Sequence, residues 1–104
     1  MIETTEKIIF EGQEFVGRTT EIGFINGHFR FSSRYPEGGS YSTSIPISPL
    51  SYRLEYPTKT KFKDDGDQLI IASDHGETST IQASRHIILS LIDECLEQQI
   101  PEYR

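Results

Sequence analysis

Residues 22–31, which read IGFINGHFRF, decide the fold. At their centre, Asn26-Gly27 predicts a two-residue β-turn of type I′, because both central residues of that turn need a positive φ angle. A two-residue turn also fixes the register of the strands on either side. The expected opposing pairs are Ile25 with His28, Phe24 with Phe29, and Ile22 with Phe31. Side chains alternate along a strand, so the apolar members of the last two pairs share one face, opposite Gly23 and Arg30.

Similar patterns on both sides of this hairpin predict further strands over most of the first 83 residues. Apolar segments separated by turn residues, or alternating with polar residues, lie at 8–10, 15–16, 41–45, 52–56, 58–63 and 69–71. Asp64-Asp65-Gly66-Asp67 is expected to form a turn. Pro46 and Pro49 cannot donate hydrogen bonds to a ladder, so the chain around them is expected at a sheet edge or in a loop.

The pattern changes near the end of the chain to the period of a helix. Apolar residues recur at three- and four-residue spacing: Ile88, Leu91, Ile92, Cys95 and Leu96. The segment from Ser79 to Gln82 fits a capping box, and Ser84 is an alternative start one turn later. Pro101 is a stop signal. We therefore predict a single α+β domain over residues 1–104, an antiparallel sheet of about five to seven strands with one C-terminal α-helix packed on it.

Composition excludes several classes of protein. The chain has 104 residues and a formal net charge of −6. No apolar run approaches the roughly 18 residues of a membrane span, so no membrane partner is expected. The N-terminus shows no basic segment followed by an apolar one, which argues against a signal peptide and favours a cytoplasmic location. The single cysteine rules out an internal disulfide and any four-thiolate metal site.

No pattern of catalytic, metal-binding or cofactor-binding residues stands out. His28, His75 and His86 are expected in three different elements, without the spacing of a metal site. Cys95 lies on the apolar helix face, where cysteine behaves as a small hydrophobic residue. The acidic turn lacks the ligand spacing of a calcium loop, and there is no nucleophile elbow or phosphate loop. We expect a protein that is not an enzyme, with no catalytic residue, cofactor or metal.

Charge is distributed unevenly along the chain. Residues 15–63 carry a net charge of +4, whereas residues 64–104 carry nine carboxylates against two arginines. Three of these carboxylates lie in the last turns of the predicted helix, where the helix dipole makes negative charge mildly unfavourable. Either they form a solvated face, or they form an anionic surface for a cationic partner. The residues of that candidate surface are Asp64, Asp65, Asp67, Asp93, Glu94 and Glu97.

A basic stripe offers an alternative binding function. Lys59, Lys61 and Lys63 alternate along one predicted strand, and Arg30 lies on the polar face of the hairpin. Basic sheet faces with aromatic residues bind single-stranded nucleic acid through phosphate contacts and stacking. Lysines on an edge strand have another common role, which is to prevent pairing between sheets of different molecules.

Four features of the chain match a known class of small proteins. They are its length, the single free Cys95, the lack of a signal peptide and the acidic stretch from Asp64 through Glu102. In these features the chain resembles the small acidic immunity proteins encoded beside bacterial toxins, including those of contact-dependent growth inhibition systems. The resemblance implies a cytosolic protein that binds a cognate basic toxin, often a nuclease, and blocks its active site. The basic segment at residues 15–63 departs from a uniformly acidic inhibitor.

Overall fold

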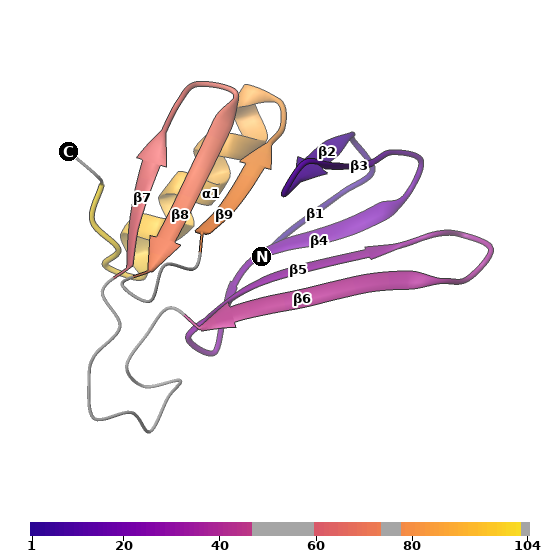
Figure 1. The fold of residues 1–104 in the computed structure, drawn as a ribbon, viewed down its shortest axis with the longest axis horizontal. Coiled ribbons are helices and arrows are strands. Elements are labelled where there is room, and N and C mark those ends of the chain that lie inside the picture. The colour runs from indigo at the N-terminus through magenta and orange to yellow at the C-terminus, as the bar shows by residue number, and fades with distance from the viewer. Residues whose placement is uncertain (47–59, 74–77, 103–104) are drawn as a thin grey trace.

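A computed structural model describes residues 1–46, 60–73 and 78–102, and these form two antiparallel sheets and one helix (Figure 1). The four-stranded sheet has the order β1 (Ile2–Thr4), β4 (Thr19–Ile25), β5 (His28–Arg34) and β6 (Ser40–Pro46). The five-stranded sheet has the order β3 (Gln13–Phe15), β2 (Ile8–Phe10), β9 (Thr78–Gln82), β8 (Gln68–Ser73) and β7 (Thr60–Asp64). The helix is α1 (Arg85–Glu97), of 13 residues, and no described helix has the length and apolar character needed to cross a membrane.

The α+β class and the C-terminal helix are confirmed. The nine strands of the described residues are divided between two sheets, a division that the strand pattern alone did not indicate. The chain leaves the β2–β3 hairpin and enters the other sheet between Phe15 and Thr19, where Gly17 adopts a φ of +70° that other residues tolerate poorly. The predicted strand at 52–56 and the segment around His75 lie outside the described residues.

The central hairpin forms as predicted. Asn26 and Gly27 have φ angles of +51° and +74°, and all three predicted pairs are observed in the ladder between β4 and β5. The turn between β2 and β3 has the same character, with Glu11 at +51° and Gly12 at +80°. Local turn chemistry therefore fixes the register of both hairpins.

The core lies between the two sheets and under α1. The ring of Phe10, from the five-stranded sheet, stacks on the ring of Phe31, from the four-stranded sheet, with centroids 4.3 Å apart and planes inclined by 3°. Phe15 meets Phe31 edge to face at 4.9 Å. All three rings are almost completely buried. Such aromatic pairs add about 0.5–1.5 kcal/mol each beyond the area they bury, so they join the sheets as well as fill the space between them.

A buried arginine borders this core. The Arg18 guanidinium lies 3.5 Å from the centroid of the Tyr35 ring and 5.1 Å from that of Phe15. Its Nη2 donates a hydrogen bond to the carbonyl oxygen of Ser33 at 3.3 Å. The positive charge is thus stabilised by two aromatic rings and a carbonyl, an arrangement that favours a cation away from water.

Two details of α1 differ from the sequence-based prediction. The segment from Ser79 to Gln82 belongs to β9, so the predicted capping box is wrong and the alternative start at Ser84 is correct. Leu96 was expected on the buried face but is 57% exposed. The residues buried against the sheets are instead Ile87, Ile88, Leu91 and Cys95. The helix is therefore rotated toward Ile87, which leaves Leu96 facing solvent.

Glu94 ties α1 to the edge of the four-stranded sheet. β1 is short and covers β4 only as far as Ile22, so the next amide of β4 on that side has no strand beside it. The Oε1 of Glu94 accepts a hydrogen bond from the backbone N–H of Phe24 at 3.0 Å and lies 3.2 Å from the amino nitrogen of Met1. A helix carboxylate thus takes the place that a further residue of β1 would hold in the ladder.

Gly23 leaves the room that this contact needs. Its φ is +149°, and a Cβ built there would lie 2.5 Å from Oε1 of Glu94 and 2.8 Å from Cα of Met1. We expect Gly23→Ala to lower the free energy of unfolding by about 2–4 kcal/mol, from backbone strain and the clash together. Equilibrium urea unfolding measures this change.

The matched control is Gly39→Ala, at a φ of +86° with nothing within 4 Å of the added Cβ. It carries the backbone strain without the clash, so we expect it to cost about 1 kcal/mol. Equal losses in the two variants would contradict the close contact with Glu94.

Candidate partner-binding surface

The structure separates the six candidate carboxylates instead of gathering them. Asp64, at the end of β7, pairs with Arg85 in the first turn of α1. The guanidinium donates to both carboxylate oxygens, with Nη1–Oδ1 at 2.6 Å and Nη2–Oδ2 at 2.9 Å, and also to the carbonyl oxygen of Gly66 at 2.6 Å. The hydrogen bonds from Arg85 and from the Gly66 N–H lower the pKa of Asp64 to about 2. Asp64 is therefore engaged in holding the β7–β8 turn against the helix.

The other two acids of this turn differ from each other. The carboxylate of Asp65 lies 3.7 Å from Nζ of Lys63, both side chains being well exposed. Asp67 is exposed and has no ion pair among the described residues. The turn as a whole sits at the N-terminal end of α1, where Arg85 holds it.

The helix acids lie at the other end. Asp93 follows Arg85 by eight residues, which corresponds to about 12 Å along the axis. Asp93 and Glu97 are exposed, without an ion pair among the described residues, whereas Glu94 points inward to Phe24. Of the three predicted helix carboxylates, two therefore remain available to a partner.

Two leucines accompany these two acids on the outer face of α1. Leu89 is 47% exposed and Leu96 is 57% exposed, and their spacing of seven residues puts them on the same side, two turns apart. The exposed residues of this face are His86, Leu89, Ser90, Asp93, Leu96 and Glu97. We call this set the outer face of α1. The sequence did not predict the exposed leucines of this face, because the three- and four-residue spacing of apolar residues is equally consistent with Leu96 on the buried side.

The structure places the described members of the alternative basic set in two different sheets. Arg30 lies on β5 in the four-stranded sheet, and Lys61 and Lys63 lie on β7 in the five-stranded sheet. Lys63 approaches Asp65, as described above, and Lys61 also has an interaction partner. Lys59 lies outside the described residues.

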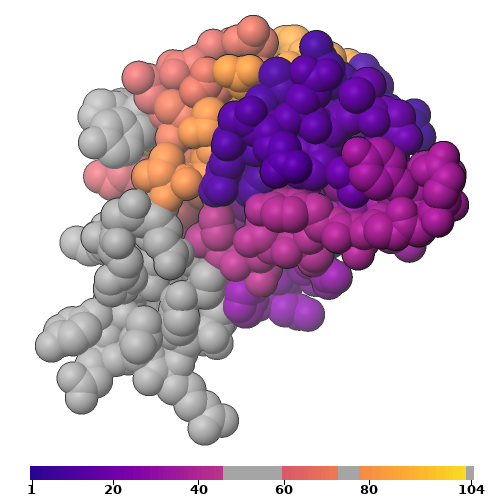
Figure 2. All heavy atoms as spheres, turned by 45° about the vertical axis from the view of Figure 1, so that its right-hand side comes forward, coloured from indigo at the N-terminus to yellow at the C-terminus, as the bar shows by residue number. Residues whose placement is uncertain are grey.

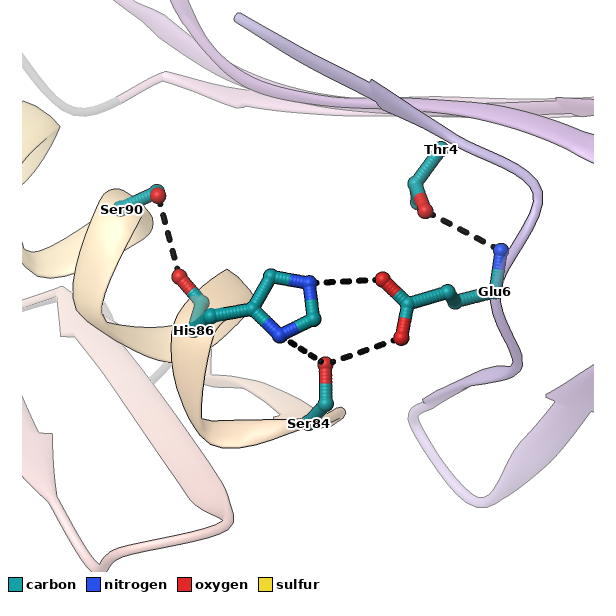
Figure 3. Close-up of polar contacts among 5 residues, drawn as sticks. All are labelled: Thr4, Glu6, Ser84, His86 and Ser90. Carbon is teal, nitrogen blue, oxygen red and sulfur yellow. Dashed lines mark hydrogen bonds and ion pairs between the residues drawn. The ribbon is translucent and has the colours of Figure 1, made fainter.

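A polar cluster that sequence reasoning missed joins the β1–β2 connection to α1 (Figure 3). Nε2 of His86 lies 2.7 Å from Oε2 of Glu6, and Nδ1 of His86 lies 3.1 Å from Oγ of Ser84. The Ser84 hydroxyl also donates to Oε1 of Glu6 at 3.3 Å, which closes the ring of contacts. Ser84 begins the helix without capping it, because its side chain turns toward this cluster. Glu6 is 80 residues from His86 in sequence, so no local signal could pair them.

This cluster contains the side chains of a serine–histidine–acid arrangement, but it is open to water. Nucleophilic catalysis by serine relies on an oxyanion site and on water exclusion besides the neighbouring base. The His86 and Glu6 side chains are 69% and 49% exposed. The closed ring of contacts favours a clasp that holds the N-terminal segment against the first turn of α1.

Shallow hollows mark the outer surface of the five-stranded sheet, where β9 lies between β8 and the N-terminal strands (Figure 2). The larger, of about 710 Å³, is lined by Ile9, Glu11, Gly12, Thr78, Thr80 and Gln82. The smaller, of about 300 Å³, is lined by Lys7, Ile9, Asp67, Gln82, Ala83 and Ser84. Among the described residues, no group of three or more histidine, cysteine, aspartate or glutamate side chains is arranged to hold a metal ion.

Cys95 is fully buried on the inner face of α1, as its place on the apolar face of the predicted helix indicated. Burial, together with the neighbouring Glu94 charge, raises the pKa of its thiol to about 12. A thiol in this state is a poor nucleophile at neutral pH.

Comparison of the chain with protein-family models, with curated protein sequences and with solved structures gave no match.

The lowered pKa of Asp64 leads to a prediction about acid stability. A carboxylate whose pKa is lower in the folded state stabilises that state above its unfolded pKa, near 4, and this contribution is lost as the pH falls toward 2. We therefore expect Asp64→Asn to be less stable than the wild type at pH 7, with the difference shrinking between pH 4 and pH 2. Thermal unfolding across this pH range measures the difference.

Asp67→Asn is the control for the same turn, since Asp67 has no ion pair among the described residues. Its difference from the wild type should stay small and nearly constant. A difference for Asp64→Asn that is unchanged by acid would argue against the pairing with Arg85.

Proposed function

We propose that this chain is a non-enzymatic binding protein that holds a basic protein partner against the outer face of α1. The partner that fits best is a basic toxin with a cationic active site. In this proposal the chain is a small acidic immunity protein that blocks that active site in the cytoplasm. The observation that carries this proposal is the combination of two exposed leucines with two carboxylates that have no ion pair among the described residues. Each of these components supports a different part of binding.

The leucines supply apolar anchors. Leu89 and Leu96 are about half exposed, and nothing in the described part of the chain covers them. Complete burial of an exposed leucine side chain gains about 1.5–3 kcal/mol. A small number of well-packed side chains usually provides most of the binding energy of a protein interface. Leu89 and Leu96 lie where a partner could bury both at once.

The carboxylates supply charge that lacks local compensation. Asp93 and Glu97 lie one turn apart near the C-terminal end of α1, where the helix dipole is negative, and the last turn contains no basic residue. A cationic partner would relieve this unfavourable concentration of negative charge. Such complementarity mainly speeds association, through attraction at a distance.

The helix is also held rigidly enough to present a defined surface. Arg85 and His86 fasten its first turn to Asp64 and Glu6, and Glu94 fastens its last turns to β4. Its inner face is packed into the core through four buried residues. A surface fixed before binding loses less conformational entropy when the partner arrives.

The nucleic-acid alternative has less support from the same structure. Those of its basic residues that the structure describes are divided between two sheets, and Lys63 lies near the carboxylate of Asp65. Retention of the chain on a single-stranded oligonucleotide column at about 50 mM salt would favour that function instead, because phosphate contacts are strongest at low salt.

The test uses the basic proteins encoded by the reading frames on either side of this chain's own, with binding followed by surface plasmon resonance. We expect Asp93→Lys with Glu97→Lys to slow association at least about tenfold at low salt, and the effect should shrink as salt screens the charges. Leu89→Ala with Leu96→Ala should instead speed dissociation, because it removes apolar contact without changing charge.

The control makes the same change in net charge elsewhere. The control residues are Glu14, on β3, and Glu37, in the turn between β5 and β6, and both are replaced by lysine. Glu37 lies at the opposite end of β5 from the Asn26-Gly27 turn. Association that slows equally in the control would mean that only net charge matters. Absence of binding by the wild-type chain would refute the proposal.

A further inference from the structure

β6 has an open edge. It is the last strand of the four-stranded sheet and pairs with β5 over all seven of its residues. No other described element lies along its second side (Figure 1). No residue of β6 has a hydrogen bond beyond those to β5, so its outward-facing backbone groups have no protein partner in the described structure.

The turn between β5 and β6 identifies which backbone groups face outward. The N–H of Tyr35 donates to the carbonyl oxygen of Gly39 at 3.1 Å. Hydrogen-bonded and non-hydrogen-bonded pairs alternate in an antiparallel ladder, so Tyr41, Thr43 and Ile45 bond to β5. The N–H groups of Ser40, Ser42 and Ser44 therefore point outward. Pro46 follows at the next outward position, where its missing donor breaks no bond to β5.

The other sheet edges carry features that discourage pairing with another molecule. β1 and β3 have three residues each and include Glu3 and Glu14. β7 carries two lysines, and its outer side is bonded to the C-terminal segment, where the N–H of Phe62 donates to the carbonyl oxygen of Pro101 at 3.0 Å. β6 is seven residues long and contains no charged residue. A long uncharged edge of this kind is a ready template for another strand.

We propose that β6 pairs with β6 of a second copy of this chain, so that two four-stranded sheets join into one antiparallel sheet of eight strands. The uncharged composition of β6 is what favours a second copy over a basic partner, because the strand offers no charge for a cation to recognise. This interface is independent of the outer face of α1 and does not rest on the function proposed above.

The outward-facing groups define the register of the pairing. With Thr43 on the two-fold axis, the N–H and carbonyl groups of Ser42 face those of Ser44 of the partner subunit. By symmetry, the same groups of Ser44 face those of Ser42 of the partner subunit. The same register puts Tyr41 opposite Ile45 of the partner subunit on the inner face of the sheet. Tyr41 is 37% exposed and Ile45 is half-buried, so this contact would cover apolar surface that the single chain leaves open. Aromatic and β-branched residues are favourable cross-strand neighbours.

The first experiment measures molar mass by light scattering during size-exclusion chromatography of the full chain. We expect the mass to rise from 11.9 kDa toward twice that value as the concentration increases from about 10 to about 500 μM, the range in which a modest interface associates. Ser42→Pro with Ser44→Pro removes two outward donors and spares the bonds to β5, so this variant should stay monomeric. Ser42→Val with Ser44→Val keeps the donors and should still dimerise.

A second pair of variants covers the case in which proline disturbs the fold. Ser42→Lys with Ser44→Lys adds charge along the edge and should also prevent dimerisation. Ser32→Lys adds a charge to the same sheet in the paired strand β5 and should leave the dimer intact. A wild-type chain that stays at 11.9 kDa across the whole range, or edge variants that dimerise as the wild type does, would overturn the proposal.

Cross-linking tests the register. Thr43 is opposite itself in a non-hydrogen-bonded pair, where Cα atoms are about 4.5 Å apart and a disulfide fits. We expect Thr43→Cys to form a covalent dimer rapidly under mild oxidation, while Cys95 stays buried and unreactive. Ser40→Cys would lie roughly 20 Å from its symmetry mate and should cross-link slowly. Equal cross-linking rates for the two variants would refute this register.

Discussion

The stacking of Phe10 on Phe31 is the contact on which the rest of the structure depends. Phe10 belongs to β2, which pairs with β9 at two positions, so few backbone pairs join the β2–β3 hairpin to the rest of the five-stranded sheet. Its ring, pressed flat against Phe31, connects that sheet to the central hairpin of the other. The position of α1 follows, because the helix packs against β7 of the five-stranded sheet and against β1 and β4 of the four-stranded sheet, where Glu94 bonds to the backbone of β4. A shift of one sheet relative to the other would therefore disturb both the stacking of Phe10 on Phe31 and the bond from Glu94 to β4.

Features encoded in adjacent residues could be predicted from the sequence, and features that depend on distant contacts could not. The turn at Asn26-Gly27 needs only its own backbone preferences, so the register of β4 and β5 followed from it. The clasp between Glu6 and His86 joins residues 80 positions apart and appears only once the N-terminal segment lies beside the helix. The change of sheet at Gly17 is a similar case, since a glycine alone does not indicate which sheet comes next.

The candidate surface was predicted in part, and α1 shows why. Its acidic residues were evident, but a charge in the sequence does not reveal whether the side chain is already engaged, as Asp64 and Glu94 are. The apolar period of the helix was also evident, yet Leu96 and Ile87 compete for the buried side. The sheets beneath the helix decide between them by which side chains fill the core, and that information is spread over several strands.

The burial of Cys95 gives the molecule a built-in reporter of its own opening. The sequence contains one cysteine, and its thiol is covered by the body of α1 and is almost entirely protonated at neutral pH. A thiol-specific reagent can react only when the thiol is exposed, either by local detachment of the helix or by global unfolding, and a labelling rate above the rate of global unfolding reveals the local detachment. The native chain therefore allows local detachment of the helix to be distinguished from global unfolding without an introduced label.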